Sequence, residues 1–536
     1  MATGITLVQA LLIGLAYFAL RITQLGGTFA GPFFFSPLPM ALIVGIVLGD
    51  VPQAMVIGAH LQLIYLGMVS PGGSAPSDVC IASMIGVSMA IAGGLDQDVA
   101  VLMAVPAGVL GRQLNVLIYT INVMCSHLAD KHAAEGDDKG VFVAGAILPQ
   151  IAKFVATIPL TIIVYVGPAL AEAIMNNVPQ WVMSGFATAG KLMPALGFAL
   201  LLNSIGKANL MPFFFIGFLA IKYLGVPIIP VAIVAAFMAY FWLVFTSGED
   251  SLKGFRFDTS EADEREHVLD MKDIRKVYFR WWLFAEATHN YERMLGHSFC
   301  LSMIPAINKL NGDNKDEKAA ALTRHMQFYN CEVVFGSIIP GVIAAMEEQR
   351  AMGAKEITDT TITGIKTGLM GPMAGIGDTL NVGTFLPIVI SLFLPLAESG
   401  SALGALGPFC VYAITGFVVG WFLCKFGYQL GSRAALQLMR SGLFNQIITA
   451  ASVLGLVVIG ALCSNYVSIT TPLVIETIST TYAIQDVLDG ILKGALTLIA
   501  IFGTRMFINK VNRNYVVAIG MLFAIGFICG ALGILG

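Results

Sequence analysis

Long apolar blocks separated by short polar connections run through most of this chain. In the first 247 residues the blocks fall near 4–20, 38–49, 53–69, 79–93, 99–124, 141–170, 181–203, 208–222 and 225–247. They resume near 366–377, 381–397, 404–424, 446–464, 492–508 and 514–535. A helix needs about 20 apolar residues to cross a bilayer, so we expect the shorter blocks to be half-helices or re-entrant hairpins. The pattern predicts an all-α polytopic membrane protein with broken helices.

A charged stretch divides the chain into two parts. Between Glu249 and Arg280 lie 9 acidic and 7 basic residues, which predicts a soluble, cytoplasmic linker. The predicted domains are a transmembrane domain at 1–246, the linker at 247–282 and a second domain at 283–536. Within the second domain, the amphipathic region 283–365 is expected to lie near the cytoplasm, whereas 366–536 returns to the membrane.

The composition supports a membrane protein and excludes several other classes. The chain is 57% hydrophobic and 12% charged, far from the composition of a soluble domain, and its net charge of −3 gives no sign of a nucleic-acid partner. The 8 cysteines form no CxxC pair, so neither a disulfide framework nor a zinc site is indicated. No basic residue precedes the first apolar run, Thr6–Leu20, which we expect to be a membrane segment.

The stretch Lys366–Pro387 is apolar but unusually rich in residues that disturb helices. It holds 5 glycines, 2 prolines and one acid, Asp378. This density predicts an interrupted helix, which a membrane tolerates only where the backbone is buried in protein or lines a wet cavity. We expect Gly371, Gly375 and Gly377 to be hinges and Asp378 to mark a site. The alternative is a tight interhelical turn in which Asp378 is only a cap.

A similar stretch lies earlier in the chain. Gly67–Asp78 also runs from a glycine through proline and small residues to an acid, and we expect Gly72 and Gly73 to be its hinges. Interrupted segments at corresponding positions of two halves point to a transport site between the repeats. Asp78 is expected to contact the solute, because an ionised carboxylate in lipid has few purely structural roles.

Other polar residues interrupt the apolar runs and are candidates for binding a solute. Gln62 and Asn115 carry amides that can both donate and accept hydrogen bonds; interhelical hydrogen bonding is the alternative. His289, Asn290 and Glu292 crowd one turn of chain. That cluster fits a structural ion-pair group, a contact with a solute or partner, or, least well, a metal site.

No self-contained catalytic apparatus is visible in the sequence. A metal site would need further ligands such as His325 and Glu332, so we expect neither a metal nor another cofactor. The GIGDTL run at 375–380 lacks the third glycine and the Lys-Ser/Thr of nucleotide-binding loops. Whether the chain counts as an enzyme therefore depends on partners.

Long motifs in both halves resemble a known transport family. The first half contains SPLPMALIVGIVLGD (36–50), HLQLIYLGMVSPGGSAPSD (60–78), HLADK (127–131) and LMPFFFIGFL (210–219). The second contains NYERM (290–294), SMIPAI (302–307), RHMQFYN (324–330), AAMEEQRAMGA (344–354) and GIKTGLMGPMAGIGDTLNVGT (364–384). The first set resembles the IIC membrane subunit of mannose-family phosphotransferase systems (PTS), and the second resembles the IID subunit. The chain thus resembles a fusion of IIC and IID.

This resemblance implies a sugar translocator in the cytoplasmic membrane of a bacterium. Its partners would be the lipid bilayer, a hexose or related sugar, and cytoplasmic IIA and IIB proteins supplied by HPr and enzyme I. A phosphohistidine on IIB would phosphorylate the sugar, so the chain would be only the membrane part of a phosphotransferase. The resemblance also implies inverted, pseudo-symmetric halves with core and V-motif subdomains, a homotrimer and elevator-like movement.

The resemblance carries over to individual residues unevenly. Motif positions of the family match Gln62, Asp78, Asn290, Glu292, Arg293 and Asp378. After the acid that corresponds to Asp378, the family usually has Trp and Arg. This chain has Val382 and Leu386 at those positions, and Asn381 adds an amide. These differences point to an unusual hexose, an amino sugar or a sugar conjugate. The predicted substrate-binding residues are Gln62, Asp78, Asn115, Asn290, Glu292, Asp378 and Asn381.

Two other functions remain open at this stage. An ion-coupled secondary sugar transporter would use the same acids as coupling sites and would work without IIB. A passive pore or a surface receptor is the third class, with its binding surface in extracellular loops.

Overall fold

The protein is almost entirely helical, which confirms the predicted all-α class. The computed structural model describes residues 4–22, 36–66, 77–94, 97–177, 179–253, 267–290, 292–355, 357–440, 443–467, 469–476 and 481–536. Within these ranges the sheet structure is one antiparallel hairpin, β1 (Val474–Glu476) with β2 (Thr481–Ala483).

The helices of the first half alternate between long rods and short pieces. They are α1 (Leu7–Arg21), α3 (Pro37–Leu48), α4 (Val51–Tyr65), α5 (Val79–Gly93), α6 (Gln97–Ala134), α7 (Asp138–Phe142), the π-helix η3 (Val143–Ile147), α8 (Leu148–Val155), α9 (Thr157–Asn177), α10 (Gln180–Leu192), α11 (Pro194–Ile205), the 3₁₀ turn η4 (Ala208–Leu210), α12 (Met211–Leu224) and α13 (Ile228–Lys253).

The second half follows the same alternation. Its helices are α14 (Met271–Phe284), α15 (Gly296–Asn311), α16 (Lys315–His325), the 3₁₀ turn η5 (Phe335–Ser337), α17 (Ile338–Ala351), α18 (Asp359–Gly377), the π-helix η6 (Asp378–Phe385), α19 (Leu386–Glu398), α20 (Leu403–Arg440, broken at Gly431), α21 (Leu443–Tyr466), α22 (Ile484–Ile491), α23 (Ala495–Lys510) and α24 (Tyr515–Ala531).

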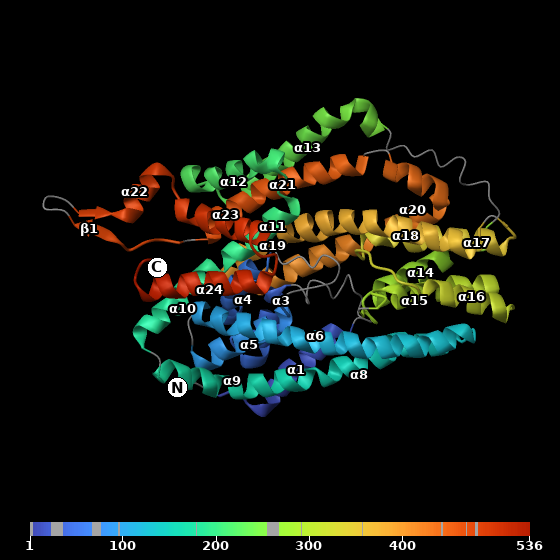
Figure 1. Ribbon diagram of the computed structural model, residues 1–536, viewed down its shortest axis with the longest axis horizontal. Helices are drawn as coiled ribbons and strands as arrows, with labels where there is room; N and C mark the ends of the chain where they lie inside the picture. Colours follow the sequence, from blue (N-terminus) through green and yellow to red (C-terminus); the bar gives the residue numbers. More distant parts are fainter. Residues whose placement is uncertain are drawn as a thin grey trace.

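The two halves pack against each other along much of the molecule. Helices α12 and α13 of the first half pack on α21 of the second, α10 packs on α24, and α11 packs on α23. Most helices run roughly along the long axis, and the β1–β2 hairpin projects at one end (Figure 1). The interface between the halves is therefore part of the hydrophobic core.

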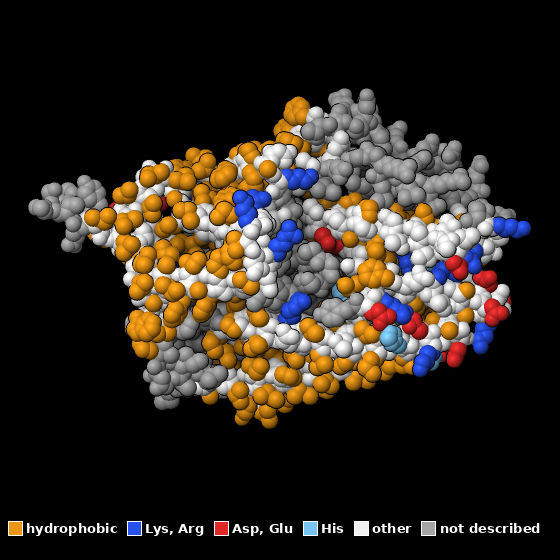
Figure 2. Space-filling model, viewed as in Figure 1, with side chains coloured by type: hydrophobic (Ala, Val, Ile, Leu, Met, Phe, Trp, Pro, Cys, Tyr) orange, Lys and Arg blue, Asp and Glu red, His pale blue; other side chains and the backbone are white. Residues whose placement is uncertain are grey.

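The surface is divided into an apolar part and a charged end. Hydrophobic side chains cover the part that contains α9, α10, α23 and α24, whereas most acidic side chains gather at the end occupied by α14–α17 and the end of α6 (Figure 2). Exposed apolar surface on this scale is suited to lipid. The helices at the charged end have their own core, in which Trp281, Phe299 and Tyr329 are fully buried.

Several helical stretches are long and apolar enough to cross a membrane. In the described residues, four such stretches occur, Asp138–Gly167, Asp359–Glu398, Leu403–Gln429 and Thr449–Tyr466, and two bent helix pairs raise the number to six. The pair Ile484–Ile491 and Ala495–Lys510 bends by 76°. The bent pairs confirm the prediction of broken helices in a protein that crosses the membrane several times.

The interruption expected at Lys366–Pro387 is not observed. Helix α18 continues into η6 and then into α19, and the Leu386 N–H bonds to the Asn381 carbonyl with the wider spacing of a π-helix. Pro372 lies inside α18, where it removes one backbone hydrogen bond without ending the helix. The wider turn of η6 lets the helix continue where the glycines and prolines were expected to break it.

The predicted hinge glycines fall in different surroundings. Gly371 and Gly375 lie on an open face of α18, whereas a side chain at Gly377 would collide with Glu332. Gly72 and Gly73 lie outside the described residues. A hinge role for these glycines stays a prediction.

Buried ionic groups join the helices at the charged end. Arg324 donates two hydrogen bonds of 2.7 Å to Glu347, and His325 Nε2 lies 2.9 Å from the same carboxylate. Arg324 and Glu347 are 3% and 1% exposed. Arg324 also reaches Asp359 at the start of α18. The network fixes α16, α17 and α18 to one another.

Acidification should weaken this bundle through Glu347. Burial alone would raise the pKa of Glu347, but the hydrogen bonds from Arg324 and His325 lower it to about 2. A lowered folded-state pKa contributes stability above the unfolded value of about 4.3 and loses it as pH falls towards 2. We expect Glu347→Gln to destabilise the protein by about 3 kcal/mol at neutral pH. This difference from wild type should shrink below about pH 4.

Thermal unfolding of the detergent-solubilised protein across this pH range measures the difference. The control is Glu317→Gln, since Glu317 is 47% exposed and lies 3.5 Å from Arg350; its effect should stay below about 1 kcal/mol. An equal effect of both substitutions, or a Glu347→Gln difference that does not change with pH, would contradict the assigned role.

Candidate functional site

The first acid that was predicted from the sequence, Asp78, lies in a buried polar group. Its carboxylate caps α5 by accepting from the Ile81 N–H at 3.0 Å. The Tyr17 hydroxyl donates to it at 3.1 Å, and the Asn115 amide donates at 3.0 Å. The Arg21 guanidinium lies 3.5 Å from the same carboxylate. We call Tyr17, Arg21, Asp78 and Asn115 the Asp78 group.

Arg21 connects the members of this group. It donates hydrogen bonds to the Tyr17 hydroxyl and to the side-chain amide oxygen of Asn115. Tyr17 and Arg21 are one turn apart on α1, so both side chains face the same direction. Sequence reasoning missed both residues, although an arginine at the end of an apolar run was a usable signal. The Asp78 charge is thus balanced within the protein.

Gln62 lies on α4 and is only partly satisfied. Its carbonyl oxygen accepts from the Ser36 hydroxyl at 2.5 Å and from the Leu38 N–H at 3.4 Å. The side chain is fully buried, and its amide nitrogen has no partner among the described residues. A buried donor without a partner is costly, so the Gln62 amide is the least satisfied group of this place.

The second predicted acid, Asp378, begins the π-helix η6. Asn381, one turn later, donates 2.8 Å to the Glu332 carboxylate and 2.9 Å to the Tyr412 hydroxyl. Glu332 also accepts from the N–H groups of Val334 and Phe335 at the start of η5. We call Glu332, Asp378, Asn381 and Tyr412 the Asp378 group.

Two acids lie close together in the Asp378 group. The Glu332 carboxylate lies against Gly377, the residue before Asp378, so the two acids are neighbours at this contact. Asp378 is half-buried and accepts no hydrogen bond from a described residue. Sequence reasoning named Glu332 as a possible metal ligand and did not include it among the seven binding residues. It did not find Tyr412, because α20 meets η6 only in the folded chain.

Asn290 and Glu292 lie at a junction between the two halves. Asn290 is fully buried, donates to the Ser126 hydroxyl at 3.2 Å, and accepts from the N–H groups of Glu292 and Arg293. Arg293 forms a two-pronged pair with Asp130 of α6 at 2.5 and 2.8 Å. This arrangement shapes a turn and attaches it to α6.

Glu292 itself is exposed at this junction. His127 lies 2.8 Å from its carboxylate, and that hydrogen bond lowers the pKa of Glu292. The ion-pair interpretation of this cluster therefore matches the observed contacts. In the described residues, no group of three or more His, Cys, Asp or Glu side chains could hold a metal ion.

The seven predicted binding residues thus fall into four places. Asp78 and Asn115 lie together, as do Asp378 and Asn381 and as do Asn290 and Glu292, while Gln62 lies with Ser36. No hydrogen bond described for these residues joins one place to another. Their shared role in binding stays a prediction.

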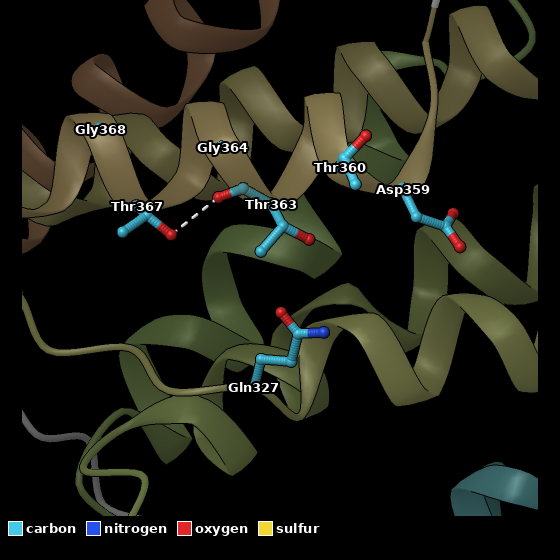
Figure 3. Close-up of a pocket in the computed structure, with 7 residues that line it drawn as sticks. All are labelled: Gln327, Asp359, Thr360, Thr363, Gly364, Thr367 and Gly368. Carbon is cyan, nitrogen blue, oxygen red and sulfur yellow. Dashed lines mark hydrogen bonds between the residues drawn. The ribbon is translucent and has the colours of Figure 1, made fainter.

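A groove of about 620 Å³ lies along the exposed face of α18 near the charged end. Figure 3 shows Thr363 on α18 opposite Gln327 across this groove, with Thr367 on one side of it and Asp359 and Thr360 on the other. Thr367 bonds to the carbonyl of Thr363 at 2.8 Å. The groove contains none of the seven predicted binding residues.

An acid and an amide on the π-distorted part of a helix long enough to span the membrane, Asp378 and Asn381, are typical of the class of membrane transporters. Two family models divide the chain between them. The model for the PTS sorbose-specific IIC component matches residues 7–241, and the model for the IID component of the mannose/fructose/sorbose family matches 268–535. The chain belongs to the mannose/fructose/sorbose family of the PTS. It is a sugar-translocating membrane component that combines IIC-like and IID-like halves.

Individual relatives resemble one half each. The mannose-specific EIID component of Escherichia coli (strain K12) is 36% identical over 285 residues, covering 52% of this chain and 99% of the relative. The mannose-specific EIIC component of the same organism is 26% identical over 264 residues, covering 49% and 99%. A chain from the cryo-EM structure of the mannose transporter ManYZ with microcin E492 is 35% identical, covers 51% of this chain and 100% of its own, and has a TM-score of 0.30.

Replacing Asn290 tests whether this residue is structural. Asn290→Ala should destabilise the protein by about 2–3 kcal/mol, because the two N–H groups and Ser126 lose a buried partner. Unfolding of the purified protein measures this change. The matched control is Asn308→Ala, since Asn308 on α15 also bonds to the first half, through Asp138, but at an exposed position. A normal stability combined with weakened sugar binding would instead support the predicted contact with substrate.

Proposed function

We propose that this chain carries a hexose or related sugar across the bacterial cytoplasmic membrane for phosphorylation by the phosphohistidine of a IIB protein. A IIA protein, HPr and enzyme I would supply the phosphoryl group. The observation that carries the proposal is the joining of two nearly full-length matches, to EIIC and to EIID, in one polypeptide. Those relatives are named mannose-specific, which supports a hexose as the substrate.

The polar groups inside the membrane are suited to bind sugar hydroxyls. The amide nitrogen of Gln62 can donate, and the carboxylate of Asp378 can accept, since neither has a described partner for that role. A hydrogen bond to a charged group contributes about 1.5–3 kcal/mol. Asp78, whose charge is already paired, would contribute by positioning Asn115, whose amide donates to the Asp78 carboxylate.

Phosphorylation would help release the product. A phosphorylated sugar gains about 1.5 to 2 negative charges near neutral pH. The Asp378 group already holds two acids, since Glu332 lies against Gly377 beside Asp378, so the product would be repelled where the neutral sugar was accepted. Repulsion of this kind gives the transport cycle a direction without a catalytic residue on this chain.

The larger architecture is proposed from the family resemblance. The halves would be inverted relative to each other, with core and V-motif subdomains that move like an elevator. Three copies of the chain would form a homotrimer. The three domains would be 1–246, 247–282 and 283–536. In the structure α13 continues to Lys253 and α14 begins at Met271, so both helices extend into the proposed linker.

Uptake experiments test this function directly. Cells that express the chain with IIA and IIB should accumulate sugar phosphate from a radiolabelled hexose, and cells without IIB should not. Chromatography of the cell extract separates free sugar from sugar phosphate. Accumulation of free sugar without IIB, abolished by an uncoupler, would instead establish an ion-coupled carrier and overturn the proposal.

The two acids should respond differently to neutralisation. Asp378→Asn should reduce uptake about tenfold or more and leave unfolding nearly unchanged, because Asp378 has no described partner to lose. Asp78→Asn should reduce both uptake and stability, because Arg21 keeps its buried charge without a counter-ion. Uptake and thermal unfolding are measured for both variants. Normal transport by both would remove these acids from the site.

A further inference from the structure

Two ranges of the chain, one from each half, carry positive charge without any acid. Residues 180–248 hold three lysines, and residues 490–536 hold two lysines and two arginines. Neither range contains an Asp or a Glu. Their helices pack together, α10 on α24 and α11 on α23. The contact between the halves is therefore positively charged in this region.

Hydrogen bonds bring four of these cations to one place. Arg505 of α23 donates to the Gly206 carbonyl at 2.8 Å and to the Asn203 side chain at 3.1 Å, at the bend between α11 and α12. The Asn509 amide donates to the same Asn203 oxygen at 2.8 Å. The other three cations lie within four residues of these bonded residues along the chain. We call the four cations the basic junction: Lys207, Arg505, Lys510 and Arg513.

The positive charge of the basic junction is not balanced within the described parts of the chain. There, none of its four cations forms an ion pair, and all but Arg505 are exposed. The described acceptors of Arg505 are neutral, namely the two at the bend and the Met211 sulfur. Those bonds use three of its five N–H donors, so two remain for an acceptor outside the chain.

The basic junction lies at the edge of the apolar surface. Met506 and Val511, which neighbour its cations in the sequence, are 57% and 71% exposed. Lys and Arg side chains gather at the border of the hydrophobic part near α11 and α23 (Figure 2). Cations that border a lipid-exposed surface lie at the level of the lipid headgroups.

The opposite ends of α12 and α23 carry charges of both signs. Lys222 near the end of α12 contacts Gly494 just before α23, and the Gly494 N–H bonds to Asp489 at 3.2 Å. Connections on the cytoplasmic side of a membrane carry an excess of Lys and Arg. The basic junction therefore marks the cytoplasmic side of these helices, where the leaflet contains anionic lipids.

We propose that the basic junction binds the phosphate headgroup of an anionic phospholipid in the cytoplasmic leaflet. The phosphate oxygens accept from the remaining N–H groups of Arg505 and from the neighbouring lysines, and the acyl chains lie against Met506 and Val511. The lipid supplies the negative charge that the described protein lacks here. Because Lys207 belongs to the first half and the other three cations to the second, the bound lipid joins the two halves.

A soluble phosphate fits this place less well than a lipid. Exposed cations in water contribute little to the binding of a small ion. A phospholipid adds apolar contact along its acyl chains, and the membrane holds its headgroup at the level of the basic junction. The lipid is therefore the occupant that matches both the charge and the neighbouring apolar side chains.

Native mass spectrometry of the purified full-length chain tests the inference. The protein is titrated in detergent micelles with phosphatidylglycerol, which is anionic, or phosphatidylcholine, which carries no net charge. The first phosphatidylglycerol should bind more tightly than the first phosphatidylcholine. Neutralising the three exposed cations together, in Lys207→Gln/Lys510→Gln/Arg513→Gln, should weaken this preference about 10- to 100-fold, since each cation near a lipid surface contributes about fivefold.

A charge-matched control separates a local site from overall charge. The control variant is Lys272→Gln/Lys315→Gln/Lys355→Gln, which removes three exposed lysines from the charged end and should keep the preference. Both variants should fold, because none of the substituted side chains makes a described hydrogen bond. Arg505 stays intact in both, since its bonds hold the bend between α11 and α12.

Three outcomes would overturn the inference. The first is equal binding of the two lipids by the wild-type protein, and the second is an equal loss of preference in both variants. The third is displacement of phosphatidylglycerol by millimolar glycerol phosphate, which would identify a soluble phosphate as the ligand. These measurements contain neither sugar nor IIB, so their result is independent of the proposed function.

Discussion

The requirement that a charge inside a membrane protein be compensated organises this structure. Asp78 is stabilised by Arg21, Tyr17 and Asn115, which joins α1, α5 and α6 through one carboxylate. At the charged end, Glu347 holds Arg324 and His325 in the same way. Burying each such group costs desolvation energy, and its ion pairs and hydrogen bonds fix the helices relative to one another. The packing of apolar side chains fills the space between these fixed points.

At the π-helix η6 the acidic charges are only partly compensated. Its wider turn places Asn381 between Glu332 and Tyr412, so three elements that are distant in the sequence meet at one amide. The close fit of Gly377 against Glu332 keeps α18 and the start of η5 together. Asp378 has no described partner, whereas Glu332, Asn381 and Tyr412 are hydrogen-bonded to one another, so Asp378 is the most available acceptor of the group. That combination is suited to a binding site, where rigid neighbours orient a group left free for the ligand.

The contacts across the two halves explain why a fused chain can work as one unit. Arg293 and Asn290 attach the second half to α6, and α21 packs between α12 and α13 of the first half. Residues that looked like binding residues in the sequence, such as Asn290, are occupied at this junction. A polar side chain in an apolar context is therefore ambiguous, because packing between domains and binding of a solute need the same residue types.

The sequence by itself determined the class of this protein and its family. Apolar blocks of spanning length exclude a water-soluble fold, and the long motifs in each half identified IIC-like and IID-like parts. Pairs close in sequence, such as Asp378 with Asn381, were found for the same reason. Only the tertiary structure joined Asp78 to Arg21 and Asn381 to Tyr412, since these partners come from separate helices whose contact no local pattern encodes. It also showed that Lys366–Pro387 stays helical, because tertiary contacts and a wide turn outweigh the weak helix propensity of glycine and proline.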